Sequence, residues 1–481
     1  MPRLRRLAPE ETVVLAASVL ALAYTLSLLW LAHRNGSLRG DDIVFFSDAR
    51  RSRFLDFIAE PMDVHAVPLH RAVTYLVTAL GRPSFDRLLV FMAAVHVLGV
   101  VCLYRALETF APNPGNAVAT FWYATFVELI CLFLWWTSAL HRFPYVALSA
   151  MALYAYARFR REQTPRWALA VLLAVVAALG FFEKGVVIPL MLAAIEASLV
   201  FETDARDRAR NWLLVGGIGA IALSYFAAWR CAVGHDWSAL SLEPSRLLVY
   251  GASSLRMLLS ATVGRVYEWV WAAAVFWVLL IGVTIRRAPR TALLWISGLL
   301  VVTASLLSTG ISVARFQVWG NMLPYYSHRY YPDVMFVVVV FVALVWQRAF
   351  PSGASALRGR RSRRLSATSA IMAMTALSMV SLISAHRLMK TSYPETLESK
   401  KYIDNVVAGI DALERTHRPL AFVDGTVPTH LNPLGGDSAR HSILLHALGY
   451  RARFYDVRLA RRGRGVYRIA DSGRIELFSH K

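Results

Sequence analysis

Two adjacent carboxylates follow the first apolar block of the chain. The segment GDDIVFFS at 40–47 places Asp41 and Asp42 beside aromatic residues that suit a membrane interface. A carboxylate at a membrane boundary feels a lower dielectric than one in water, so we expect its pKa to rise toward the range of a general base. The alternative interpretation is a helix cap, because Asp is favoured at helix N-termini. Asp41 and Asp42 are the candidate catalytic residues.

Histidine and basic side chains recur between later apolar blocks. Such groups can bind the oxygens of a phosphate, and a compact lysine ammonium acts there as a point charge. The alternative is that these are ordinary polar loop residues, and that Glu183 and Lys184 form a local pair that closes a turn. The sequence fixes no third metal-ligating side chain to accompany His65 and His70, so their spacing does not predict a metal site. The candidate binding residues are His65, His70, Arg71, His141, Arg142, Glu183, Lys184, His328 and Arg329.

Long apolar blocks must position these residues. Hydrophobic residues make up 57% of the 481-residue chain, and a bilayer core takes about 20 apolar residues per helix. We predict an all-α polytopic membrane protein with about 11 transmembrane helices and a small C-terminal α/β domain. The predicted spans are 12–32, 87–107, 117–138, 143–158, 166–182, 185–202, 211–230, 267–285, 291–310, 331–348 and 366–386.

The arginines predict the orientation of the chain. The net charge of +21 is concentrated in short loops such as Arg158–Arg161, Arg206–Arg210, Arg286–Arg290 and Arg358–Arg364. Basic loops stay in the cytoplasm beside anionic lipid, so the charge favours a lipid bilayer over a nucleic-acid partner. An odd number of spans then puts the N-terminus in the cytoplasm and the C-terminal domain outside the cell membrane. Residues 231–266 are expected to add an interfacial helix rather than a further span.

The composition divides the chain into two domains. Residues 1–386 form the transmembrane domain with a first outer loop at 33–86, and residues 387–481 form the extracytoplasmic domain. The second domain is predicted as helix 395–416, strand 420–424, helix 438–448 and strand 451–457. Its His430, Asp437 and His441 favour an ordinary loop over a metal site.

Glu128 falls near the middle of the third predicted span. An ionisable group at membrane depth is a functional hypothesis by default. The alternative is a hydrogen bond to a neighbouring helix, and Glu128 is not placed among the site residues. The three cysteines, Cys102, Cys131 and Cys231, predict no disulfide framework.

Together these segments resemble the GT-C membrane glycosyltransferases, the superfamily that includes the protein O-mannosyltransferases and bacterial enzymes that use polyprenol-phosphate sugars. The resemblance covers roughly 12–386, and its specificity lies in the order of short motifs along one topology. The matching segments are Asp41-Asp42, HAVP at 65–68 running to Gly81, WWTSALHR ending at Arg142, FFEKGVVIP at 181–189 and HRYYP at 328–332.

The resemblance implies an activity in a bacterial cell envelope. A first-loop aspartate would act as general base on the acceptor, and basic outer-loop residues would hold the phosphate of a polyprenyl-phosphate-linked sugar donor. The acceptor would be an envelope lipid, glycan or protein at the outer face of the plasma membrane. A divalent metal ion is an open possibility, with no cofactor certain. The chain has Asp-Asp where the family often has Asp-Glu, and Glu183-Lys184 reverses the common Lys-Glu order.

Other functions fit the same topology. A transporter or flippase of a lipid-linked envelope intermediate would show internal repeats and polar, broken helices near the bilayer centre. Here the polar groups fall mostly in outer loops, which favours a reaction at the interface. A third hypothesis is a non-catalytic envelope assembly protein whose C-terminal domain recruits a partner.

Overall fold

The computed structural model describes residues 8–61, 66–200, 204–233, 244–264, 269–310, 328–351, 360–418, 420–432, 439–456 and 466–478. His65, Asp437, Arg358 and residues 311–327 lie outside these residues. The helices of the larger domain, with η marking 3-10 turns, are α1 (Pro9–Asn35), α2 (Asp41–Arg51), α3 (Phe54–Ala59), α4 (Pro68–Ala79), α5 (Phe85–Phe110), α6 (Gly115–Ala124), α7 (Leu129–Phe133), α8 (Trp136–Glu162), α9 (Pro165–Phe181), η1 (Glu183–Val186), α10 (Val187–Ser198), α11 (Ala205–Val233), α12 (Pro244–Thr262), α13 (Val270–Arg287), α14 (Thr291–Gly310), η5 (His328–Tyr330), α17 (Tyr331–Ala349) and α19 (Arg360–Ser392).

Helices that can cross a bilayer dominate this domain. Within the described residues, 7 helices are long and apolar enough by length and composition, namely those at α1, α5, α11, α13, α14, α17 and α19. A bilayer core needs about 20 apolar residues per crossing. The chain therefore has the helices of a multi-pass membrane protein, as predicted from its sequence. The count of about 11 spans stays a prediction.

The predicted span 117–138 is not one helix, and this prediction is wrong. Helix α6 ends at Ala124, α7 is short, and α8 begins at Trp136. The break places Glu128 between α6 and α7, where its carboxylate contacts His328. A buried carboxylate needs such a partner. Because α8 starts early, His141 and Arg142 lie within a helix and not in the predicted loop.

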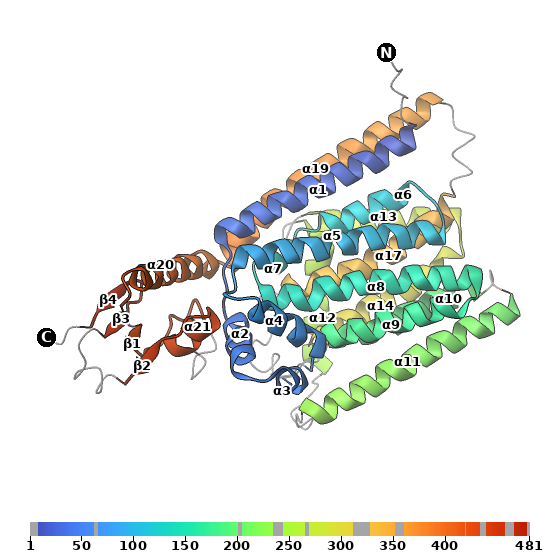
Figure 1. Cartoon of the computed structure of the whole chain (residues 1–481). Coiled ribbons are helices and arrows are strands. Elements are labelled where there is room, and N and C mark those ends of the chain that lie inside the picture. Colours follow the sequence, from blue (N-terminus) through green and yellow to red (C-terminus); the bar gives the residue numbers. More distant parts are fainter. Residues whose placement is uncertain are drawn as a thin grey trace, which may run out of the picture.

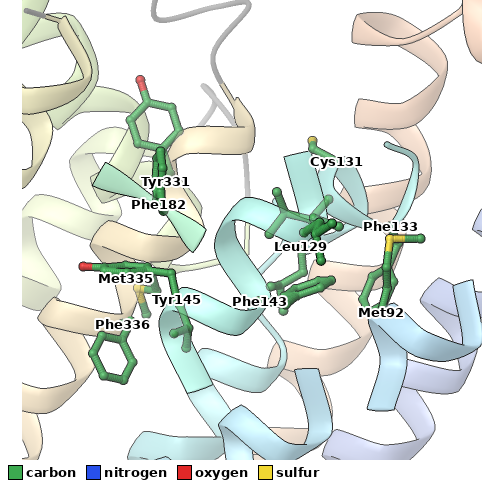
Figure 2. Close-up of a cluster of buried hydrophobic side chains, with 14 of the residues drawn as sticks. Met92, Leu129, Cys131, Phe133, Phe143, Tyr145, Phe182, Tyr331, Met335 and Phe336 are labelled. Atoms are coloured by element: carbon green, nitrogen blue, oxygen red, sulfur yellow. The ribbon is translucent and has the colours of Figure 1, made fainter. Parts of the chain in front are cut away.

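The core packs around α8, which contacts α5 and α9 along its length. Figure 2 shows aromatic and sulfur-containing side chains from several helices meeting there, among them Met92, Phe143, Tyr145 and Met335. Almost every residue of α17 is buried. Its valine-rich run disfavours a helix only slightly. Burial on all sides outweighs that cost.

The segment 231–266, for which the sequence predicted an interfacial helix, contains helix α12. It packs against α13 and α14, and the carbonyl of Thr262 near its end accepts a hydrogen bond of 2.6 Å from the Trp122 indole. Helix α12 is not among the helices apolar enough to cross a bilayer. Its placement at the interface stays a prediction.

The C-terminal domain combines helices with a four-stranded sheet of order β2-β1-β3-β4. Strand β1 is parallel to both neighbours, and β3 pairs antiparallel with β4. The predicted helices and first two strands are present, whereas β3 and β4 were not predicted. The elements are α20 (Glu395–Arg415), β1 (Ala421–Val423), α21 (His441–Ala447), β2 (Arg453–Tyr455), β3 (Tyr467–Ile469) and β4 (Ile475–Leu477).

This small domain sits at one end of the helical bundle, against the first loop. Helix α21 packs on α2, and Arg82 donates a 2.8 Å hydrogen bond to Glu414 of α20. Figure 1 shows the start of α1 at the opposite end of the bundle, with α1 and α19 side by side. The first loop and the C-terminal domain therefore lie at the same end of the helical bundle.

Candidate functional site

Helix α2 positions the two candidate carboxylates. It begins after Gly40, whose φ of +51° is a backbone conformation that residues other than glycine rarely adopt. The Gly40 N–H donates to the carbonyl of Leu431 in the C-terminal domain at 2.9 Å. The turn at Gly40 therefore ends the segment that follows α1 and begins α2. Its hydrogen bond to Leu431 also joins the start of α2 to the C-terminal domain.

Asp42 is fully buried and its oxygens are occupied. Its Oδ1 accepts hydrogen bonds from the Thr137 backbone N–H at 2.8 Å and hydroxyl at 2.6 Å. Its Oδ2 accepts from the Arg39 N–H at 3.3 Å. Burial raises the pKa of Asp42 to about 7, against the lowering effect of these hydrogen bonds, with a small further rise from Asp41. Asp42 therefore fastens the first loop to the start of α8.

Asp41 has a different environment. It is the first residue of α2 and is partly exposed. Within the part of the chain that the structure describes, its carboxylate accepts no hydrogen bond, and it lies close enough to Arg329 for an electrostatic interaction. The two adjacent carboxylates are thus not equivalent. Asp41 is open to an incoming group, and Asp42 is not.

Two arginines flank one tryptophan beside Asp41. The Arg39 guanidinium carbon lies 5.0 Å from the centre of the Trp135 ring, and that of Arg329 lies 4.0 Å from it. Aromatic faces hold guanidinium groups through cation–π attraction. Arg39 also forms a 2.9 Å ion pair with Glu395 of the C-terminal domain. Arg329 is the more exposed of the two cations.

A buried ionic cluster lies next to this pair. The Lys184 ammonium is 2.7 Å from Asp333 Oδ2, and Arg142 Nε is 3.9 Å from Asp333 Oδ1. Tyr330 links the clusters, because its ring lies 4.6 Å from the Arg142 guanidinium and its hydroxyl accepts a 3.3 Å hydrogen bond from Arg329. Among the residues that the structure describes, one carboxylate, that of Asp333, contacts these cations, so this described group carries a net positive charge. Such a region can stabilise a developing negative charge.

Three aromatic rings continue the site toward α4. His70 and His141 have ring centroids 4.3 Å apart, and His141 stacks on Phe182 at 5.5 Å. Phe182 in turn lies 5.0 Å from the Arg142 guanidinium. The first loop, the start of α8 and the turn before η1 are therefore joined by ring contacts. The predicted residues His70, His141, Arg142 and Lys184 are brought together.

Other predicted residues do not join this group. His328 is buried, and its Nδ1 lies 2.9 Å from Glu128 Oε1, so it braces α17 against the α6–α7 break. Arg71 is buried against α3, where it donates to the Phe57 carbonyl and lies 3.3 Å from Glu60. Glu183 opens the η1 turn and interacts electrostatically with Tyr225. His65 lies outside the described residues.

Sequence reasoning missed several members of the site. Arg39, Trp135, Asp333 and Tyr330 were not named as candidate site residues, although Trp135 and Tyr330 lie in the WWTSALHR and HRYYP segments. Asp333 had a usable signal, because an acidic residue in the first turn of a largely apolar helix needs a cationic partner. Arg39 had another, since it directly precedes Gly40-Asp41 in the loop that was predicted to lie opposite the basic loops.

The described residues offer no ready metal site. They contain no group of three or more His, Cys, Asp or Glu side chains that could hold a metal ion. Asp42 gives its oxygens to Thr137 and Arg39, so the carboxylate pair does not present two free ligands. His430 lies 3.8 Å from Glu398, and His441 pairs with the Tyr402 hydroxyl at 2.7 Å. The expectation of a divalent ion gains no support from this donor set.

No family model and no curated protein sequence matches this chain. The likeness to the GT-C glycosyltransferases therefore rests on its own short motifs and their order.

Proposed function

We propose that this protein is an integral membrane glycosyltransferase of GT-C type. It moves a sugar from a polyprenyl-phosphate donor to an envelope lipid, glycan or protein acceptor on the extracytoplasmic face of the plasma membrane. Asp41 is the general base, Asp42 positions α2, and the basic residues behind them receive the lipid phosphate.

One observation carries the proposal. Residues from five separate elements meet at one end of the bundle: an open carboxylate at Asp41, the Arg39–Trp135–Arg329 stack beside it, and the Arg142–Lys184–Asp333 cluster behind. This arrangement pairs a proton acceptor with excess positive charge at the edge of helices that can lie in a bilayer. Sugar transfer from a phosphodiester needs these two things.

The chemical step follows from that pairing. The acceptor hydroxyl attacks the anomeric carbon, and Asp41 takes the hydroxyl proton. The bond from the anomeric carbon to the phosphate oxygen breaks, and its electron pair leaves on the polyprenyl phosphate. Phosphate is a good leaving group, so no general acid is needed. The attack and departure occur on opposite faces of the sugar carbon, which inverts its configuration.

The test is a transfer assay with purified protein in nanodiscs, a polyprenyl-phosphate sugar and candidate envelope acceptors. We expect Asp41→Asn to lower kcat by about 100-fold or more, the typical contribution of a general base. Asp56→Asn, which removes an exposed carboxylate from the same loop, is the matched control and is expected to retain full activity. Full activity in the Asp41→Asn/Asp42→Asn double variant would remove the proposed base.

A second assay separates this proposal from its main competitor. The same protein in proteoliposomes would be given a fluorescent polyprenyl-phosphate sugar on one side. Glycosyltransferase activity releases polyprenyl phosphate. Movement of the intact headgroup across the bilayer without cleavage would favour a flippase instead.

A further inference from the structure

A hollow lies between the first loop and the C-terminal domain, away from Asp41. Its volume is about 300 Å³, and its walls come from the end of α2, from α4 and from the segment that follows α21. The chemically active residues of the wall are Arg50, Tyr75, His446, Tyr450 and Arg451. None of the described lining residues is a carboxylate. The cavity therefore has a basic and aromatic wall without an internal counter-charge.

Arg50 shows the charge imbalance most clearly. Its Nη2 donates one hydrogen bond of 2.8 Å to the Gly81 carbonyl. Its Nε is buried without a hydrogen-bond partner. Burial lowers the pKa of Arg50, and the neighbouring Arg82 lowers it further. A guanidinium has donors in a fixed fork that fits two oxygens of a phosphate. Arg50 thus retains unused donors beside an empty volume.

His446 experiences the same surplus of positive charge. Burial lowers its pKa, and Arg51 and Arg50 lower it further. Its Nε2 is buried without a hydrogen-bond partner in the described structure. An anion in the cavity would supply the acceptor that this ring and Arg50 both need.

Gly449 allows the backbone after α21 to approach Arg50 closely on one side of the cavity. Its φ is +84°, and a Cβ built there would lie 2.7 Å from Arg50 Nη2. Only glycine combines this backbone conformation with so close an approach. The segment after α21 therefore packs directly against the Arg50 guanidinium, which forms a cationic wall of the cavity.

We propose that this cavity is a binding site for a phosphate group, held by Arg50, His446 and Arg451. The phosphate belongs to a lipid headgroup or to a free phosphorylated molecule, which share the same oxyanion chemistry. Tyr75 and Tyr450 provide the flat walls beside it. Both domains contribute residues, so bound phosphate strengthens the contact between them.

The position of the cavity suggests which substrate it serves, and this step rests on the proposed function. Asp41 and Arg50 occupy the first and last turns of the same helix, about 14 Å apart along its axis at 1.5 Å per residue. An acceptor whose phosphate lies at Arg50 can extend along α2 toward the Asp41 carboxylate. The cavity would then select phosphorylated acceptors.

The test uses the full-length protein in nanodiscs without any sugar donor. Binding of inorganic phosphate is measured by calorimetry. Binding of a lipid phosphate is measured by native mass spectrometry, which counts the phosphatidic acid retained from a phosphatidylcholine bilayer that contains it. Because no donor is present, failure of phosphate binding and failure of sugar transfer are read separately.

Three variants decide the outcome. The double variant Arg50→Gln/Arg451→Gln removes two charge-assisted donors and should weaken binding by about tenfold or more. Ala79→Trp fills the cavity from an exposed position and should abolish binding with the charges intact. The control Arg87→Gln/Arg474→Gln removes two exposed arginines from the same two domains and should leave binding unchanged.

Each result assigns the ligand or rejects the site. Loss of phosphatidic acid alone in the cavity variants identifies a lipid headgroup, and loss of inorganic phosphate identifies a free ligand. Equal phosphate and lipid binding in wild type, the double variant and Ala79→Trp would overturn the proposal.

Discussion

The Lys184 ammonium lies 2.7 Å from the Asp333 carboxylate although 149 residues separate them in the chain. Both side chains are buried, and Arg142 is the second cation at the same carboxylate. Lys184 precedes α10 and Asp333 lies in the first turn of α17. The pair therefore fixes the relative position of these two helices beside the candidate site.

Breaking this pair should cost far more than breaking a surface pair. Asp333→Asn leaves the buried Lys184 and Arg142 cations without this carboxylate, with an expected loss of about 3–5 kcal/mol in the free energy of unfolding. Lys184→Met should cost less, because Arg142 still compensates the Asp333 carboxylate. The double variant Lys184→Met/Asp333→Asn restores the original net charge of the cluster and should recover much of that loss. Denaturation of all three in detergent measures the coupling.

The exposed pair Arg468–Glu476, at 2.6 Å on the small sheet, is the matched comparison. Its removal should cost less than about 1 kcal/mol, because solvent screens it. Additive losses at Lys184 and Asp333 would show that the two residues act independently.

Stability should fall as pH rises through the titration of Asp42. Burial raises its pKa from 3.8 to about 7, so the folded state binds the proton more tightly than the unfolded state. The resulting stabilisation is complete below about pH 4 and is lost as pH rises to about 7. Asp42→Asn removes the titration. Its melting temperature should change less than that of the wild type between pH 5 and 8.

The control for the pH series is Asp56→Asn, an exposed carboxylate in the same loop. Its pH profile should follow the wild type. An unchanged slope in Asp42→Asn would mean that another group governs the pH dependence.

Arg82 should govern how firmly the C-terminal domain docks. Its guanidinium contacts Glu414 at 2.8 Å and Asp411 at 3.6 Å and lies 4.0 Å from the Tyr450 ring. Arg82→Glu should loosen the interface, seen as faster hydrogen exchange in α2 and α21. Because Arg82 is about half exposed, each ion pair contributes less than about 1 kcal/mol and weakens with salt.

The charge-swapped variant Arg82→Glu/Glu414→Arg should slow the exchange again. Arg87→Glu, an exposed change nearby on α5, should have no effect. Equal exchange in Arg82→Glu and wild type would show that other contacts hold the domain.

The orientation of the chain can be tested by cysteine labelling. With Cys102, Cys131 and Cys231 replaced, Leu55→Cys in α3 and Leu477→Cys in β4 should react with an impermeant maleimide from outside intact cells. Arg286→Cys should react only after permeabilisation, because basic loops stay inside. Labelling of Arg286→Cys alone in intact cells would invert the topology and move the proposed reaction to the cytoplasm.

The sequence by itself determined the membrane class, most helices and the small α/β domain. Apolar length and the side occupied by arginine are local properties, and each apolar block carries its own signal. The polar segments between the apolar blocks also indicated which residues are candidates for the site. The sequence left two interpretations of Glu128 open, a functional group and a hydrogen bond to a neighbouring helix. The structure contains the hydrogen bond, whose partner is His328.

Only the tertiary structure decided how the site residues divide their roles. Asp41 and Asp42 are neighbours with the same side chain, yet Thr137, 95 residues away, occupies the second and leaves the first open. Likewise Asp333 became visible as the partner of Lys184 only when α17 lay beside η1. Long-range contacts of this kind depend on how helices pack, and no local pattern of residues encodes them.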